Sequence, residues 1–474
     1  MGRRIKPFNT ELEVVDTAVD GRGIAKHNER IVFVEKAVPG DKVHAHIFRK
    51  EKKALVARIE EIQEASSHRI EPRCEHFGIC GGCKWQHMSY KAQLEYKQKH
   101  VENAIIRIGK VEPQEKLPIL ACEKDLFYRN KLEFTASKDQ WLTGDEGPVE
   151  NLDQRVLGFH VPRVFYKIVN IENCQLQLPI VNDIRNEVRD FFREHNFPFY
   201  DHREHTGSLR SLVFRSSLAT GELMVILILA DGDKQKAEAV FTHLERKFPE
   251  VTDFLWIHNP KKNSSYTDLD FQVWKGKSYI TEKLGKYSFQ IRANSFFQTN
   301  PKQAEALYEV VRKFLVESLG EKGKVNLLYD LYSGTGSIGI FVSEYAEKVV
   351  GIEYVNEAIE DAKENVKLNQ LEDKFSFYAG DMKKILNQEF IHEHGKPEIL
   401  IADPPRAGMD PKVVNRILEM APEHIIYVSC KASTQARDIA LLKENYELLK
   451  IQPVDMFPQT AHVENVALLR RISD

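Results

Sequence analysis

The chain has 474 residues, 42% of them hydrophobic, and this length exceeds what one ordinary core holds, so two or three domains are expected. Its 67 Lys and Arg side chains nearly balance 70 Asp and Glu, which argues against a protein that coats nucleic acid indiscriminately. There is no apolar run of about 18 residues and no apolar signal core at the start, so we expect a cytoplasmic protein with no membrane partner.

Charge is distributed unevenly along the chain. Residues 1–110 hold 21 basic and 15 acidic side chains, a net charge of +6, whereas the remaining residues carry a net charge of −9. A phosphate-facing amino-terminal part would explain this asymmetry, and a solvated charged surface would explain it equally well.

Residues 10–62 alternate between apolar and polar in the manner of short strands, with polar turns at Asp20–Gly23 and Pro39–Asp41. The apolar positions of this alternation are Leu12, Val14, Ile31, Phe33, Val43, Ala45 and Ile47. The pattern predicts a small OB-like β-barrel, which we assign to residues 1–63.

Cysteines cluster just after this predicted barrel. Cys74, Cys80 and Cys83 lie within ten residues, and Cys174 is the best candidate for a fourth ligand. Four thiolates suit either an iron-sulfur cluster or tetrahedral zinc, and their spacing does not decide between the two. We assign residues 64–290 to a strand-rich central domain, with a helix at 90–108 that has Leu94, Val101, Ile105 and Ile106 on one side.

A third domain, residues 291–474, is predicted to begin with a helix at Asn300–Pro301. Strand-like and helix-like segments alternate after it, which is typical of a doubly wound α/β fold with a parallel sheet. The expected strands are 326–332, 348–353, 375–379, 399–402 and 425–429, and the expected helix between the second and third is 356–369.

A glycine-rich turn follows the first of these strands and carries Gly334 and Gly336. Two acidic residues, Glu353 and Asp381, end the next two strands, where carboxylates can contact a ribose and an adenine edge. The second acid favours S-adenosylmethionine, although the turn alone would also allow a pyrophosphate cofactor.

Two further turns lie at the same predicted edge of the sheet. Asp403-Pro404-Pro405-Arg406 forms a rigid ledge against which a flat base could be held. Cys430 ends the last predicted strand, and its thiolate could add to carbon 6 of uracil and make carbon 5 nucleophilic. Glu464 is the candidate base that removes the carbon 5 proton, which would release the thiol.

These motifs together resemble the RNA uracil-5-methyltransferases that carry an amino-terminal TRAM domain, over nearly the whole chain. The resemblance also includes Asp-Gly-Arg-Gly-Ile-Ala (20–25), Tyr-Arg-Asn-Lys-Leu-Glu-Phe (128–134), Phe-Phe-Gln-Thr-Asn (296–300) and His-Val-Glu (462–464). Two departures are Lys431-Ala432, where the family often has Asn-Pro after the nucleophile, and Asn465, where it has Thr after the base.

The resemblance implies a TRAM barrel, a Rossmann-like S-adenosylmethionine methyltransferase domain and a [4Fe-4S] cluster on Cys74, Cys80, Cys83 and Cys174. It makes Cys430 the nucleophile and Glu464 the base. Around S-adenosylmethionine or the target base it places Gln298, Tyr332, Ser337, Glu353, Asp381 and Asp403, besides the glycines. It also implies that the helix after the cysteines packs on the catalytic domain.

The resemblance is closest to the enzymes that form 5-methyluridine in large-subunit (23S) ribosomal RNA, so we expect a monomer that acts on this RNA. Arg129, Lys131 and Arg210 are candidate RNA contacts. A transfer-RNA uracil methyltransferase is the nearer alternative, but that branch typically lacks the barrel and the cysteine cluster. A non-catalytic iron-sulfur scaffold that binds RNA is the alternative from another class, and the presence of Cys430, Glu464 and a cofactor loop together argues against it.

Overall fold

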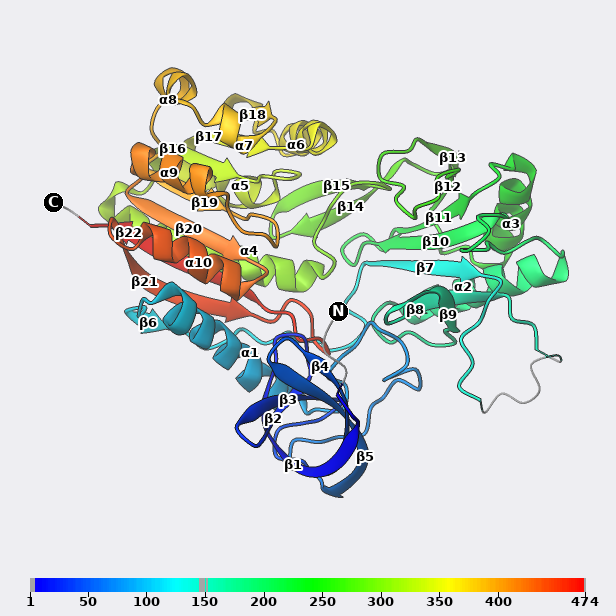
Figure 1. Ribbon diagram of the computed structural model, residues 1–474. Coiled ribbons are helices and arrows are strands. Elements are labelled where there is room, and N and C mark those ends of the chain that lie inside the picture. Colours follow the sequence, from blue (N-terminus) through cyan, green and yellow to red (C-terminus); the bar gives the residue numbers. More distant parts are fainter. Residues whose placement is uncertain (1–4, 145–149, 151, 473–474) are drawn as a thin grey trace.

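The computed structural model describes residues 5–144, 150 and 152–472. Within them are a closed five-stranded barrel, a seven-stranded sheet, a two-stranded hairpin and an eight-stranded sheet. Figure 1 shows the two large sheets on opposite sides of the molecule, with the barrel below the region between them. No helix in the described part of the chain is long and apolar enough to cross a membrane.

The barrel confirms the predicted OB-like architecture. Its strands are β1 (Phe8–Thr17), β2 (Gly23–His27), β3 (Arg30–Glu35), β4 (Lys42–Glu51) and β5 (Ala54–Glu64), and they close in the order β1-β2-β3-β5-β4. The alternation in β1 and β4 is as predicted, because Leu12, Val14, Val43 and Ala45 fill the interior.

The predicted register of β3 is wrong by one residue. Val32 and Val34 are fully buried, whereas Ile31 is 46% exposed. Phe33 points to the outer side, where the Arg22 guanidinium lies 4.3 Å from the centre of its ring. Four apolar residues in succession carry no alternation, so the pattern could not choose which pair faces inward.

A segment without regular strands, residues 65–89, carries the three clustered cysteines and leads into helix α1 (Tyr90–Ala104). A π-helical turn, Ile105–Gly109, extends α1 and packs with it on helix α10 (Ala432–Leu442) of the catalytic domain. Val101 and Ile105 are buried as predicted, whereas Ile106 is 38% exposed.

The seven-stranded sheet forms the strand-rich centre of the chain. Its order is β13 (Phe271–Lys275), β12 (Asp253–His258), β11 (Leu223–Leu229), β10 (Leu209–Ser216), β7 (Lys131–Ser137), β8 (Val156–Val161) and β9 (Val164–Asn170). Helices α2 (Pro179–Glu194) and α3 (Lys234–Lys247) cover one face. The prediction did not include these helices, although Val181, Ile184 and Val188 have the helical spacing of three and four residues.

The hairpin β14 (Tyr279–Leu284) and β15 (Tyr287–Arg292) connects the central sheet to the catalytic domain. The next helix, α4 (Pro301–Leu319), begins where the sequence predicts, and the Asn300 side chain accepts a hydrogen bond from the backbone N–H of Gln303. An amino-terminal cap followed by proline fixes this start.

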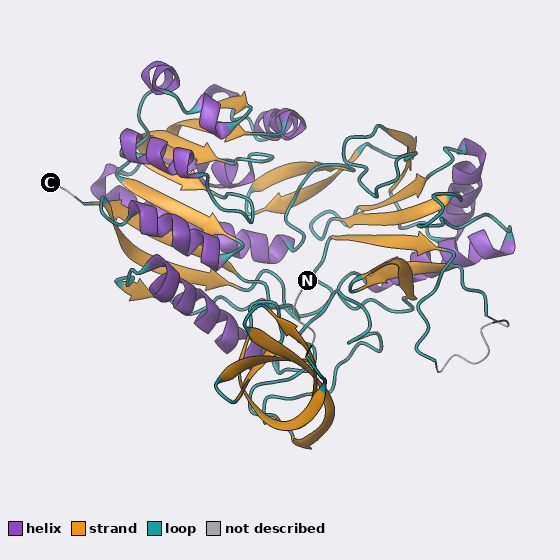
Figure 2. Ribbon diagram, viewed as in Figure 1, coloured by secondary structure: helices purple, strands orange, loops and turns teal. Residues whose placement is uncertain are grey.

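The eight-stranded sheet confirms the α/β prediction. Its spatial order is β18 (Phe375–Ala379), β17 (Ala346–Glu353), β16 (Val325–Leu331), β19 (Ile399–Ala402), β20 (His424–Ser429), β22 (Glu464–Arg471), β21 (Tyr446–Val454) and β6 (Glu115–Lys116). Helices α4, α5 (Ser337–Val342) and α6 (Asn356–Leu368) pack on one face. The other face is covered by α1, α7 (Met382–Ile385), α8 (Gln388–His394), α9 (Pro411–Met420) and α10. Figure 2 shows these two helical layers.

One strand departs from the expected parallel sheet. Strand β22 lies between β20 and β21 and runs antiparallel to both. Ser429, the last residue of β20, therefore pairs with Asn465, the second residue of β22. The reversal brings the first residue of β22, Glu464, to the edge of the sheet where Cys430 follows β20.

Candidate active site

A cavity of about 990 Å³ lies at the carboxyl edge of the parallel strands. Because strands β16, β17, β18, β19 and β20 all end at this edge, the loops that follow them bring together residues far apart in sequence. Nine of the predicted residues line the cavity: Gln298, Tyr332, Gly334, Ser337, Glu353, Asp381, Asp403, Cys430 and Glu464.

Gly336, the remaining predicted cofactor residue, is not among the lining residues. It precedes α5 with a φ angle of +75°, and a Cβ there would lie 3.3 Å from the Ala362 side chain. Gly336 therefore serves the turn and the packing of α5 on α6. Close packing also explains the glycine at position 339, because a Cβ there would lie 2.8 Å from Asp330 Oδ2.

Asp330 and Ser333 present unpaired polar atoms in the cavity. Asp330 is 2% exposed, and its Oδ2 accepts a hydrogen bond from the Gly339 backbone N–H at 3.0 Å. Its Oδ1 and the Ser333 Oγ are buried without a hydrogen-bond partner. Buried polar atoms are normally paired, so this part of the cavity fits a polar ligand such as the amino-acid end of S-adenosylmethionine.

Glu353 and Asp381 stand at the ends of β17 and β18, as the sequence predicts. Glu353 accepts hydrogen bonds from the backbone N–H groups of Gly334 (3.1 Å) and Val355 (2.9 Å). Asp381 caps α7 by accepting from the Lys383 N–H at 3.1 Å. Each carboxylate is held by one backbone bond per oxygen at most, so both keep lone pairs for a ligand.

Cys430 is half-buried and faces two carboxyl groups. Burial, followed by the charges of Glu464 and Asp403, raises the pKa of the Cys430 thiol to about 11. Arg406, from the rigid ledge, acts in the opposite direction through its charge and a side-chain hydrogen bond to the thiol. At neutral pH the thiol is therefore protonated, and Arg406 is the cation placed to favour the thiolate.

Glu464 is 5% exposed, and burial raises its pKa to about 8, with the Asp403 charge as the second cause. Burial also raises the pKa of Asp403 and of Asp330, each to about 7. Three carboxyl groups thus titrate near neutral pH in one cavity, which is typical of sites that move protons.

The His462 ring contacts the Arg406 guanidinium and orients it. The Arg406 Nη2 donates a hydrogen bond to His462 Nδ1 at 2.8 Å. Burial and the Arg406 charge lower the pKa of His462 to about 4, so its ring is neutral and can accept this bond. Since a neutral imidazole accepts through only one nitrogen, this contact fixes the orientation of the ring as well as that of the guanidinium.

The loop before Glu464 is hydrogen-bonded to residues 65–89, the cysteine segment. The backbone N–H groups of Lys84 and Trp85 donate to the Gln459 carbonyl at 2.8 and 3.0 Å. The same loop also contacts helix α1, where the Lys97 Nζ donates to the Phe457 carbonyl at 3.1 Å. The position of the candidate base therefore depends on residues more than 350 positions earlier in the chain.

Several lining residues were not predicted. Tyr308 of α4 donates to or accepts from the Ser337 hydroxyl at 2.8 Å, a contact that no local pattern indicates. Asp330 lies near the end of β16, ahead of the glycine-rich turn, and this position was the sequence signal that could have identified it as a lining residue. Phe296 and Tyr354, 71% and 72% exposed, also line the cavity.

The four predicted cluster ligands lie close enough to influence one another electrostatically. Burial, with smaller contributions from neighbouring thiols, raises the pKa of Cys80, Cys83 and Cys174 to about 11. Even so, no group of three or more His, Cys, Asp or Glu side chains within residues 5–144, 150 and 152–472 is arranged to hold a metal ion. The structure therefore gives no support to the predicted cluster.

Of the three predicted RNA contacts, the prediction for Arg210 is wrong. It is 3% exposed, and its guanidinium donates to the carbonyls of Asn259 (3.0 Å) and Asn263 (2.7 Å), so it holds a loop of the central domain. Arg129 and Lys131 are partly exposed, and their role stays a prediction.

The fold and the cavity define a class I S-adenosylmethionine-dependent methyltransferase. The family model for tRNA (uracil-5-)-methyltransferases matches residues 269–472. An uncharacterized RNA methyltransferase of Bacteroides thetaiotaomicron is 48% identical over 95% of this chain and 99% of its own length. Another from Porphyromonas gingivalis is 43% identical over 97% of this chain and 99% of its own. The chain belongs to the RNA uracil-5-methyltransferase family.

A solved structure also matches nearly the whole chain. It is the Pyrococcus abyssi tRNA (uracil-54, C5)-methyltransferase in complex with S-adenosyl-L-homocysteine, with a TM-score of 0.76 and 27% identity. The match covers 97% of this chain and 100% of that one. Because the match takes in most of residues 1–63, the amino-terminal barrel does not by itself argue against a transfer-RNA enzyme.

Proposed function

We propose that the protein transfers the methyl group of S-adenosylmethionine to carbon 5 of a uridine in RNA, through a covalent bond between Cys430 and carbon 6. The observation that supports this most is the meeting of Cys430, Glu464 and Arg406 in the cavity that also contains the glycine-rich turn. These are a nucleophile, a base and a thiol-activating cation, taken from the ends of β20, β22 and β19.

In the proposed mechanism the Cys430 Sγ forms a bond to carbon 6 as a thiolate, and the electron pair of the 5,6 double bond moves to carbon 5 and carbonyl oxygen 4. Carbon 5 then takes the methyl group, which the bound sulfonium supplies. Glu464 in its ionised form removes the proton from carbon 5. The double bond re-forms as the Cys430 Sγ leaves, and 5-methyluridine is released.

Large-subunit ribosomal RNA is the substrate that we propose first, on the motif resemblance of the whole chain. Transfer RNA is the second candidate. The match over nearly full length to the Pyrococcus abyssi tRNA (uracil-54, C5)-methyltransferase supports it.

Release of tritium from RNA labelled at uracil carbon 5 tests the chemistry and the substrate together. We expect release that depends on S-adenosylmethionine from the large-subunit transcript and none from transfer RNA. Release from transfer RNA alone would assign the protein to the second substrate, and absence of release from both would contradict the thiol adduct.

We further propose that Cys74, Cys80, Cys83 and Cys174 bind a [4Fe-4S] cluster, on the motif resemblance of the cysteine run; Cys174 is buried and the other three are half-buried. Methyl transfer requires no electron from such a cluster, so its role would be to fold the segment 65–89. Protein purified without oxygen should contain iron and acid-labile sulfide in equal amounts, and Cys80→Ser should lose both. Zinc without sulfide would contradict the proposal.

A further inference from the structure

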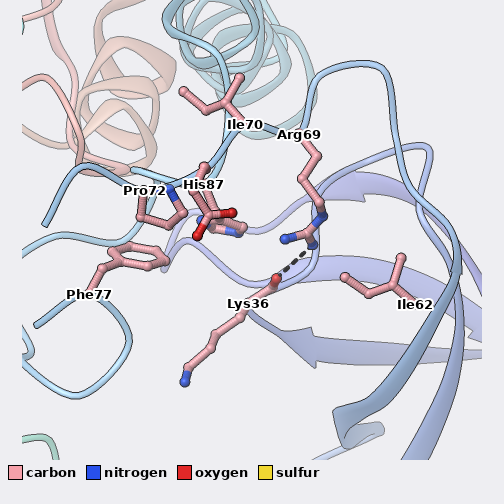
Figure 3. Close-up of a pocket in the computed structure, with 8 residues that line it drawn as sticks. Lys36, Ile62, Arg69, Ile70, Pro72, Phe77 and His87 are labelled. Carbon is pink, nitrogen blue, oxygen red and sulfur yellow. Dashed lines mark hydrogen bonds between the residues drawn. The ribbon is translucent and has the colours of Figure 1, made fainter. Parts of the chain in front are cut away.

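A second concavity of about 480 Å³ lies where the barrel meets the cysteine segment. Figure 3 shows Phe77 and His87 on one side, Arg69 and Lys36 around the opening, and Ile62 of β5 on the far side. Its volume falls within the range of about 300–1,000 Å³ that is common for small-ligand sites.

His87 lines this concavity. Its side chain is 3% exposed, and apart from a weak contact with the Ala37 backbone its ring nitrogens have no hydrogen-bond partner. The Phe77 ring lies 5.1 Å away, centre to centre. Burial lowers the pKa of His87 to about 4, so the ring is neutral and offers one donor and one acceptor.

The two cations at the opening differ in how far they are neutralised. Arg69 is held by the fully buried carboxylate of Asp41, at 2.5 Å, and by the Lys36 carbonyl at 3.0 Å. In the described part of the chain, Lys36 forms no ion pair, and its ammonium group lies over Gly78, 2.8 Å from where a Cβ would be. Glu71 is the one acidic lining residue. Lys36 therefore provides a free positive charge beside an aromatic surface.

We propose that this concavity binds one unpaired nucleotide of the RNA substrate, at a distance from the uridine that is methylated. The base would lie against Phe77 and hydrogen-bond to His87, and the phosphate would face Lys36. An aromatic face with an adjacent cation is how proteins bind single-stranded nucleic acid without reading sequence. The net charge of +6 over residues 1–110 favours an anionic partner, and the Phe77 ring in the concavity favours a nucleotide over an acidic peptide. The inference rests on the proposed function, because it needs an RNA substrate.

The test compares Phe77→Leu and Lys36→Gln with the wild type and with Lys348→Gln, a matched control. Lys348 is exposed and lies in β17, toward the end of the strand opposite the active site. Tritium release is measured against RNA concentration and against salt. Since one stacked base contributes about 1–3 kcal/mol, Phe77→Leu should raise the KM for RNA by roughly 5- to 150-fold and leave kcat unchanged. Lys36→Gln should reduce the slope of log affinity against log salt by about 0.7, the value for one phosphate contact in a single strand.

Unchanged KM and salt slope in both variants, with an active wild type, would overturn the subsite and leave the proposed function intact. A wild type that releases no tritium from any RNA would instead contradict the proposed function. If Phe77→Leu folds poorly, Lys36→Gln at the surface still decides the matter through its salt slope. An equal loss in Lys348→Gln would mean a general effect of surface charge and would also overturn the subsite.

Discussion

Gln93 of α1 and Gln459 of the loop before Glu464 form a reciprocal pair. The Gln93 Nε2 donates to Gln459 Oε1 at 3.0 Å, and the Gln459 backbone N–H donates to Gln93 Oε1 at 3.0 Å. Gln459 has a φ angle of +67°, a backbone conformation that residues other than glycine rarely adopt. The pair therefore holds a strained turn five residues before the candidate base.

Gln93→Leu should weaken the removal of the carbon 5 proton more than the formation of the thiol adduct, because the change loosens the loop that carries Glu464. We expect a methylated protein–RNA adduct that persists on a denaturing gel, together with a lower kcat. Lys91→Ala, an exposed position on the same helix, is the control and should turn over normally. A Gln93→Leu protein that releases product as fast as the wild type would show that the turn does not need this pair.

Glu464→Gln and Cys430→Ala should separate the two halves of the reaction. Removing the base should lower kcat by about 10²- to 10⁴-fold and trap the methylated adduct. Removing the thiol should abolish the adduct and tritium release together, while binding of S-adenosylmethionine measured by calorimetry is retained. An adduct formed by Cys430→Ala would place the nucleophile elsewhere.

Lys97 and Asp455 form an ion pair of 2.5 Å in which both side chains have 0% exposure. Lys97→Met should reduce the free energy of unfolding by about 3–5 kcal/mol, because it leaves a buried carboxylate without its cation. The double variant Lys97→Met with Asp455→Leu should recover most of that loss. Urea unfolding of the three proteins measures both effects, and a double variant less stable than the single one would contradict this account.

Stability of the ligand-free protein should fall as pH rises toward 8. Asp330 and Glu464 have pKa values raised by burial to about 7 and about 8, so the folded protein holds protons that the unfolded chain has released. The stabilisation is complete below the unfolded pKa, near 4, and is lost as pH passes through the folded pKa. Asp330→Asn should flatten the part of the profile up to pH 7, as measured by urea unfolding from pH 4 to 9.

Much of the catalytic domain follows from local signals. The predicted strands 375–379 and 399–402 agree with β18 and β19 residue for residue. Strand β19 is a short apolar run bounded by turns, which specifies a buried parallel strand, whereas β18 is a partly exposed strand at the edge of the sheet. The predicted strand ends and the chemistry of uracil selected Cys430 and Glu464, which line one cavity, while their catalytic roles and the domain boundaries at 63 and 290 remain predictions.

What the sequence did not indicate depends on contacts between distant segments. The reversal of β22, the His462–Arg406 contact and the entry of Tyr308 into the cavity each join elements separated by other strands or helices. The inward face of β3 was mispredicted for another reason, since Ile31, Val32, Phe33 and Val34 are all apolar. Only the closed barrel decides which two of them are buried.

The antiparallel strand β22 has a consequence for the order of synthesis. A ribosome completes the glycine-rich turn and Cys430 before it reaches residue 464, so the nascent chain has the candidate nucleophile before it has the candidate base. Until β22 inserts, β20 has an open edge that could pair with another strand. Insertion of β22 covers that edge and delivers the candidate base Glu464 in one event, so the cavity gains this carboxyl group at the moment when the eight-stranded sheet becomes complete.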